Sequence, residues 1–212
     1  MRRLAALLAR HVSIQICSSL APCQPTQLTL AARLPLFQQP ARSGEDVSCE
    51  VRIGVSATTP LNYLILIGHV DFLPALFGTL IVPPAVIGEM RHSKAPTSVA
   101  AWANRLPAWA EVKNPQTDLG LDHRLGPGER EAICLAVELK SALLVDEKLA
   151  RGAAKEVGIP VLGTLAVLDL ADEAGLLDFE QATILLQATT FRVEKALIAT
   201  ALAKVRGRKR IT

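Results

Sequence analysis

The sequence predicts an α/β protein in which helices cover both faces of a mostly parallel central sheet, a three-layer α/β/α sandwich. Three observations carry this prediction. From residue 51 onward, short apolar segments of strand length alternate with segments of helical periodicity. Such apolar strands between helices are typical of a parallel sheet that is buried on both faces. Half of the 212 residues are hydrophobic, which is enough for one domain with a sizeable core.

Each strand is expected where a short apolar run lies between turn residues, at residues 51–55, 80–82, 110–113, 142–145 and 161–162. Helices are expected where a start signal precedes an apolar pattern, at residues 61–67, 73–77, 84–90, 99–105, 128–139, 147–157, 164–173, 178–188 and 194–205. In the first half, residues 58–60 (Thr-Thr-Pro) and Pro83-Pro84 supply start signals, because proline is tolerated in the first helical turn. Ser98 is expected to cap the helix at 99–105.

The helices of the second half have clearer limits. Gly158 and Gly175 are expected to end two of them, since glycine accepts the backbone conformation that follows a helix. Thr164 is expected to cap the helix at 164–173, and Asp178 with Gln181 predicts a capping box for the next one.

The chain divides into three regions. Residues 1–50 contain four prolines and no acid before Glu45, which resembles a transit peptide, but an unstructured or spurious N-terminal extension is the preferred interpretation. Residues 51–193 are expected to form the domain. Residues 194–212 are expected to form a C-terminal helix and a basic tail. A solvated tail is the preferred interpretation, and non-specific attraction to phosphate is the alternative.

Composition excludes several classes of protein. Aromatic residues make up only 4% of the chain, which disfavours a nucleic-acid binder that works by stacking bases on aromatic platforms. The four cysteines show neither a C-x-x-C pair nor zinc-ligand spacing, so a reduced cytoplasmic protein is expected. The apolar stretch 61–87 is interrupted by His69, Asp71 and three prolines, so no membrane association is expected.

Three acids are the candidate site residues. Asp146 directly follows a buried strand, Glu131 lies early in the preceding helix, and Glu89 ends its helix, where the dipole disfavours an acid. Ligands in open α/β sheets bind outside the carboxyl ends of the strands, so the three side chains could meet there. Converging carboxylates suit Mg²⁺ or Mn²⁺, which activates water for phosphodiester hydrolysis.

Five segments resemble the PIN-domain nucleases, in the bacterial subgroup that keeps Gly-Glu-x-Glu-Ala-Ile and Gly-Thr-Leu. They are VSATTPLNYL (55–64), LIVPPAVIGE (80–89), GPGEREAI (126–133), LLVD (143–146) and VLGTL (161–165). The resemblance implies a Mg²⁺- or Mn²⁺-dependent endoribonuclease, often the toxin of a toxin–antitoxin pair. It also implies RNA as substrate, an antitoxin as protein partner and a homodimer.

The same resemblance implies roles for single residues. Asp146, Glu131 and Glu89 would bind the metal and carry catalysis, with Glu129 or Glu147 as an auxiliary acid. Glu147 and Thr58 would position water or substrate. Ala57 departs from the family pattern, because it stands where the family has a metal-binding aspartate after the first strand.

Ala57 leaves two functions open. The chain is either a ribonuclease, whether or not Ala57 impairs it, or a catalytically inactive PIN-like module that binds RNA or a protein. A third interpretation takes the acids as helix caps and solvated charges on an ordinary α/β protein.

Overall fold

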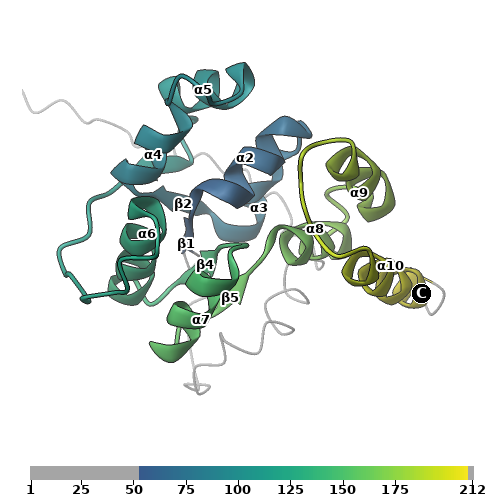
Figure 1. Ribbon diagram of the computed structural model, residues 1–212. Helices are drawn as coiled ribbons and strands as arrows, with labels where there is room; N and C mark the ends of the chain where they lie inside the picture. Colours follow the sequence, from purple (N-terminus) through teal and green to yellow (C-terminus); the bar gives the residue numbers. More distant parts are fainter. Residues whose placement is uncertain (1–52, 210–212) are drawn as a thin grey trace, which may run out of the picture.

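The structure of the protein is a computed structural model, which describes residues 53–209 (Figure 1). The extension expected at 1–50 and the last residues of the basic tail lie outside the described residues. The elements in chain order are β1 (Ile53–Ser56), α2 (Thr58–Leu66), η1 (Val70–Phe72), α3 (Leu73–Phe77), β2 (Thr79–Val82), α4 (Pro84–Met90), α5 (Thr97–Asn104), β3 (Ala110–Val112), α6 (Pro127–Glu138), β4 (Ala142–Leu144), α7 (Lys148–Glu156), β5 (Val161–Leu162), α8 (Thr164–Glu173), α9 (Phe179–Gln187) and α10 (Lys195–Lys209).

The strands form one sheet in the order β3-β2-β1-β4-β5, and every neighbouring pair is parallel. The expected α/β class with a parallel sheet is confirmed. Val55 of β1 pairs with Ile81 of β2 on one side and with Leu143 of β4 on the other. The chain therefore extends the sheet first in one direction from β1 and then in the opposite one. The crevice outside the carboxyl ends of β1 and β4 is the topological switch point of the fold.

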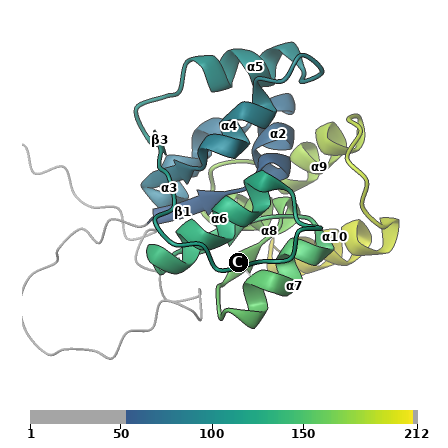
Figure 2. The ribbon, with the colours of Figure 1, turned by 60° about the vertical axis from the view of Figure 1, so that its left-hand side comes forward.

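Helices cover the sheet on both faces, which gives the expected three layers (Figures 1 and 2). Side chains that alternate along the strands enter two core clusters, with Leu80, Val82 and Leu144 in one and Val55, Ile81 and Leu143 in the other. The first cluster also receives apolar side chains of α2, α3, α4 and α8. The second receives those of α6 and α7, and Figure 2 shows α6 lying over β1. Both faces of the strands are therefore buried.

Most helix limits follow the local signals. Asp178 caps α9, where its carboxylate accepts a hydrogen bond from the Gln181 amide at 2.9 Å. Gly158 and Gly175 follow α7 and α8 at φ 77° and 71°, a conformation that glycine adopts readily. The cap expected at Ser98 is wrong, because α5 begins at Thr97 with Pro96 as its N-cap.

Helix α10 packs against α8 and α9 through ion pairs. Its basic side chains contact acids of those helices or their connection: Lys204 and Arg208 contact Asp169, Arg206 contacts Glu180, and Lys209 contacts Asp172 and Asp178. Each of these cations has an acidic partner within 3.3 Å. The positive charge of α10 is thus locally balanced, which removes the main reason to expect α10 to attract phosphate.

Within residues 53–209 no single helix is both long and apolar enough to cross a membrane. The segments Thr58–Leu66 and Val70–Phe77 satisfy length and composition only as a pair, and they are bent by 116°. Several of their apolar side chains are buried in the core of the domain, among them Leu61, Leu64 and Leu73.

Candidate active site

The candidate site lies at the topological switch point. Strand β1 ends at Ser56 and β4 ends at Leu144, and the Ala57 amide donates a hydrogen bond to the Leu144 carbonyl at 2.9 Å. Two residue pairs follow after one intervening residue each, Thr58-Thr59 after β1 and Asp146-Glu147 after β4. Parallel strands bring these two pairs to the same edge of the sheet, where ligands bind in folds of this class.

Glu89 reaches this edge from the last turn of α4. Its Oε2 accepts a hydrogen bond from the Thr58 hydroxyl, and its Oε1 accepts one from the Gly128 amide at 3.1 Å. A Cβ atom at Gly128 would stand 2.9 Å from Glu89 Oε1 and 2.9 Å from Val86 Cγ2. Only glycine allows α6 to begin this close to α4, so Gly128 fixes the position of the Glu89 carboxylate.

Glu147 lies on the other side of the same pair of threonines. The Thr59 hydroxyl donates a hydrogen bond to Glu147 Oε1. The second oxygen, Oε2, is buried and has no hydrogen-bond partner among the described residues. A buried carboxylate oxygen without a partner is costly in free energy, so its persistence in a fold requires an explanation.

Asp146 is held by Thr164 at the start of α8. Its Oδ1 accepts a hydrogen bond from the Thr164 amide at 2.8 Å, and its Oδ2 accepts one from the Thr164 hydroxyl at 2.5 Å. Burial raises the pKa of Asp146, and the neighbouring charge of Glu147 raises it further, against the opposing effects of Thr164 and Arg151. Thr164 was expected only to cap its helix. The structure gives it this contact instead, with Gly163 as the N-cap.

Glu129, at the start of α6, interacts with the other acids of the site through their charges. Burial raises its pKa, and the charges of Glu147 and Glu89 raise it as well, although a hydrogen bond from the Gly126 amide at 2.6 Å lowers it. Glu129 is therefore within electrostatic reach of both Glu89 and Glu147. The sequence indicated Glu129 and Glu147 only as auxiliary acids, because nothing in the order of residues reveals which side of α6 faces the crevice.

Glu131 has a different contact. Its Oε2 accepts a hydrogen bond from the Ala85 amide at 2.8 Å, in the first turn of α4. This bond satisfies a backbone donor that has no partner within the helix. The proposed ligands therefore divide between Glu89 and Asp146, which face acidic neighbours, and Glu131, which supports the start of α4. Its role as a metal ligand stays a prediction.

The chemistry of the donors suits a hard divalent cation, since all of them are carboxylates. Glu147 Oε2 has no hydrogen-bond partner among the described residues, and the pKa values of Asp146 and Glu129 are raised first by burial and then by neighbouring carboxylates, so ionised forms are costly here without a cation. Their arrangement is looser than a preformed metal site. Within residues 53–209, no three acidic, histidine or cysteine side chains lie close enough to hold a metal ion between them.

A family model described as a PIN domain matches residues 53–207. The chain belongs to the PIN-domain family. The expected resemblance is therefore confirmed over most of the chain, and with it a nuclease-like fold. PIN domains generally use divalent metal ions, and the family points to nucleic acid as the class of ligand. A search among curated proteins finds none that matches this chain.

Ala57, where the sequence analysis expects the family's aspartate, directly follows β1. The residue is 1% exposed and is packed in the second core cluster, at the N-cap of α2. Its methyl group supplies no oxygen to the crevice. The acidic group at the switch point is thus built from α4, α6 and the segment after β4, without a carboxylate from β1.

Helix capping accounts for part of this PIN domain's acidic group. Glu129 and Glu131 each accept a hydrogen bond from a backbone amide at a helix start, and so does Asp146. Capping does not account for the Glu147 carboxylate: Glu147 is the N-cap of α7, but its side chain makes no capping hydrogen bond, and its Oε2 has no partner in the described part of the chain. Capping also does not account for the repulsion that Glu89 and Glu147 exert on Glu129.

Proposed function

We propose that the protein is a divalent-cation-dependent endoribonuclease that hydrolyses single-stranded RNA at the carboxyl edge of its sheet. The observation that carries the proposal is the buried Oε2 of Glu147, which has no hydrogen-bond partner within residues 53–209, in a carboxylate whose charge acts on both Asp146 and Glu129. Removing such an oxygen from water has a cost that a bound cation or an ordered water would offset. Membership of the PIN-domain family supports a nuclease role for this group.

Each acid of the site has a separate role in this proposal. Asp146, Glu89 and Glu129 would hold Mg²⁺ or Mn²⁺ once their side chains move closer together around it, with Glu131 as the remaining candidate ligand. The cation, when bound, supplies a polarised water and neutralises charge that develops on the phosphate. Glu147 orients the attacking water through its unpartnered oxygen, and the Thr58 hydroxyl contacts the substrate phosphate or the water.

Cleavage of a labelled single-stranded RNA in Mg²⁺ or Mn²⁺ tests the proposal. Asp146→Asn keeps the size of the side chain and removes its charge, so we expect cleavage to fall by at least about a hundredfold. Titration calorimetry with Mn²⁺ should show one stoichiometric site that the same variant weakens. Asp71→Asn is the matched control, because Asp71 is an exposed acid of η1. Cleavage that survives both EDTA and Asp146→Asn would contradict the proposal.

Ala57 favours a second candidate, a module that binds RNA or a protein without cutting. The test is Ala57→Asp, which places a carboxylate at the end of β1, in a site where only 1% of the alanine is exposed. If the natural protein is an impaired enzyme, the variant should gain both Mn²⁺ affinity and activity, since the new carboxylate would add an anionic ligand for the cation. If the folded variant shows neither gain, the binding module is the better description.

A further inference from the structure

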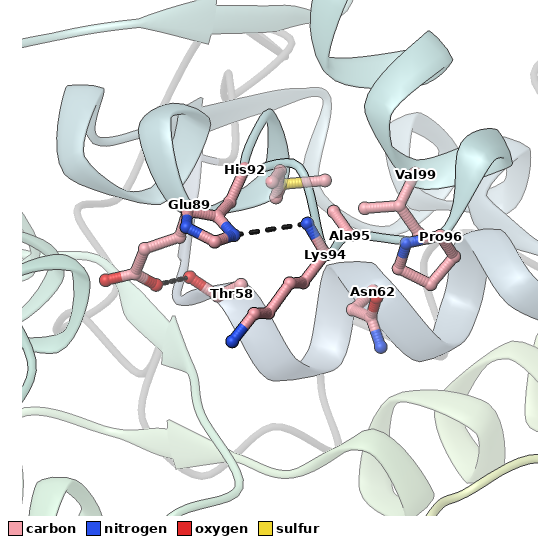
Figure 3. Close-up of a pocket in the computed structure, with 9 residues that line it drawn as sticks. Thr58, Asn62, Glu89, His92, Lys94, Ala95, Pro96 and Val99 are labelled. Atoms are coloured by element: carbon pink, nitrogen blue, oxygen red, sulfur yellow. Dashed lines mark hydrogen bonds between the residues drawn. The ribbon is translucent and has the colours of Figure 1, made fainter.

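An open cavity of about 340 Å³ adjoins the acidic group, at one end of α4 (Figure 3). Thr58 and Glu89 line it, and the same two residues share a hydrogen bond in the candidate active site. The cavity and the acidic group therefore share a wall. A chain that crosses the acidic group has direct access to the cavity, whose volume lies within the range of small-ligand sites.

The far side of the cavity is apolar. Met90 and Val99 are both 1% exposed, and Pro96 lies beside Val99 at the start of α5 (Figure 3). This wall is held in place from behind, because the Arg91 guanidinium donates two hydrogen bonds to the Ala103 carbonyl, at 3.1 and 2.7 Å. The accessible apolar surface of this wall comes from Ala95 and Pro96, because Met90 and Val99 are buried. An apolar surface accepts the face of a planar ring better than it accepts a charged group.

Three polar side chains surround the apolar wall: Asn62 from α2, and His92 and Lys94 from the loop between α4 and α5. The Lys94 backbone amide donates a hydrogen bond to His92 Nδ1 at 3.2 Å, which fixes the imidazole ring and leaves Nε2 as its donor when neutral. Neither the Asn62 amide nor the Lys94 ammonium has a side-chain partner in the part of the chain that the structure describes. Lys94 extends from the loop in the direction of Thr58 (Figure 3).

We propose that this cavity is a nucleotide subsite that holds one residue of the RNA next to the bond that is cut. The inference rests on the proposed function, which it extends. The base lies against the apolar wall and the His92 ring, and its edge is recognised by the Asn62 amide. Lys94 contacts the adjoining phosphate. Unpaired bases are recognised in this way, by packing of the ring face and by hydrogen bonds to the edge.

The charges favour RNA over a peptide segment as the occupant. The cavity is lined by the Lys94 ammonium, the His92 imidazole and the Glu89 carboxylate as well as by apolar side chains, so a ligand whose neutral part is followed by an anionic part meets a partner for each. A nucleotide has this order, with a neutral base joined to a phosphate, and its phosphate would lie where a bound cation could also reach it.

The test is RNA binding by the full chain in Ca²⁺, followed by fluorescence anisotropy with short labelled oligo(A), oligo(C) and oligo(U). A denaturing gel confirms that the RNA stays intact. Lys94→Glu should weaken binding about tenfold and make the dependence on salt shallower by about one phosphate contact. Lys155→Glu is the matched control, because it makes the same change of charge in the last turn of α7 and lines neither this cavity nor the acidic group.

Asn62→Ala tests the recognition of the base. Wild type should prefer one of the three oligonucleotides by several-fold, and the variant should narrow that preference while keeping the salt dependence. Thermal unfolding checks that each variant folds. Equal binding by Lys94→Glu and Lys155→Glu, or no binding of any oligonucleotide by wild type, would overturn the subsite.

These outcomes separate the two proposals. If Asp146-dependent cleavage is observed but Lys94→Glu behaves like its control, the subsite is wrong and the nuclease stands. If RNA binds through Lys94 and Asn62 but neither Mg²⁺ nor Mn²⁺ supports cleavage, the subsite stands and the nuclease is wrong.

Discussion

At the scale of single residues, the position of the Glu89 carboxylate depends on the absence of a side chain at Gly128. The Gly128 amide contacts Glu89, and a methyl group there would stand 2.9 Å from both the carboxylate and Val86. We expect Gly128→Ala to lower the free energy of unfolding by about 1–3 kcal/mol, the usual cost of overpacking, and to weaken Mn²⁺ binding by displacing Glu89.

Gly152→Ala is the control for that variant. Gly152 lies in α7, and a methyl group added there would have open space around it, with no contact within 4 Å. Alanine should therefore raise the free energy of unfolding by about 0.5–1 kcal/mol through helix propensity. Urea denaturation measures both changes. Equal effects of the two substitutions would show that the contact with Glu89 has no consequence.

Glu129 and Glu131 lie two residues apart in α6, and their contacts predict opposite outcomes. Glu129→Gln removes a repelling charge and can still accept the bond from Gly126, so Tm should rise by about 1–2 °C after allowance for solvent screening, while Mn²⁺ binding weakens. Glu131→Gln loses part of the bond to Ala85 and should leave Tm unchanged or lower.

Differential scanning calorimetry with and without Mn²⁺ distinguishes the two residues. A loss of Mn²⁺-dependent stabilisation in Glu131→Gln, with none in Glu129→Gln, would return Glu131 to the role of ligand. This comparison addresses what sequence could not decide. The sequence pattern predicts a helix with acids at its start, in the segment Gly126-Pro-Gly-Glu-Arg-Glu. Which of these acids faces the crevice depends on the packing of α6 against α4.

At the scale of elements, α10 is attached to the domain through buried charge. Asp172 is 2% exposed at its side chain and contacts both Arg208 and Lys209. Burial alone would raise the pKa of Asp172, but hydrogen bonds from Lys209, the Phe179 amide and Arg208 lower it overall. The stability from this contact is therefore present above the ordinary pKa of aspartate and lost as the pH falls through the lowered value.

Asp172→Asn should lower the free energy of unfolding by about 2 kcal/mol, since it removes charge-assisted hydrogen bonds from a buried position. Hydrogen exchange should show the loss mainly in α10. Glu180→Gln is the comparison, because the Glu180–Arg206 pair is exposed and solvent screening should make its effect smaller. A uniform loss of protection across the sheet would contradict local attachment.

Sequence patterns predicted the elements well where the signal was local. Apolar runs gave all five strands of the described region, and Asp178 with Gln181 gave the start of α9. Ser98 is not the cap because α5 begins two residues earlier than expected, at Thr97 after Pro96. Thr164 and Thr59 were missed as partners of acids, since each lies far along the chain from the carboxylate that it contacts.

At the scale of the whole molecule, pH has opposite effects on the stability that Asp146 and Glu129 contribute and on the binding of a cation by the same two groups. The raised pKa values of Asp146 and Glu129, caused first by burial, mean that these groups hold protons in the folded chain where the unfolded chain has lost them. Their contribution to stability is present below the ordinary carboxylate pKa and is lost as the pH rises through the raised values. Cation binding needs the ionised forms.

We therefore expect Mn²⁺ affinity to fall on acidification from a higher pH than for ordinary carboxylates, by up to about tenfold per pH unit for each group that gains a proton. Calorimetric titrations over a series of pH values measure this. Glu129→Gln should make the fall less steep, and Asp71→Asn should leave it unchanged. An affinity that is constant down to the usual range of aspartate would contradict the raised values.

The strand order has a mechanical consequence. One ladder, between Gly54–Ser56 and Ala142–Leu144, joins the half of the sheet made by β1, β2 and β3 to the half made by β4 and β5. Glu89 belongs to the first half and Asp146 to the second. A ligand bound by both residues would bridge the two halves and stabilise the pairing of β1 with β4. In its presence, amide protons of that ladder should exchange more slowly than those between β2 and β3.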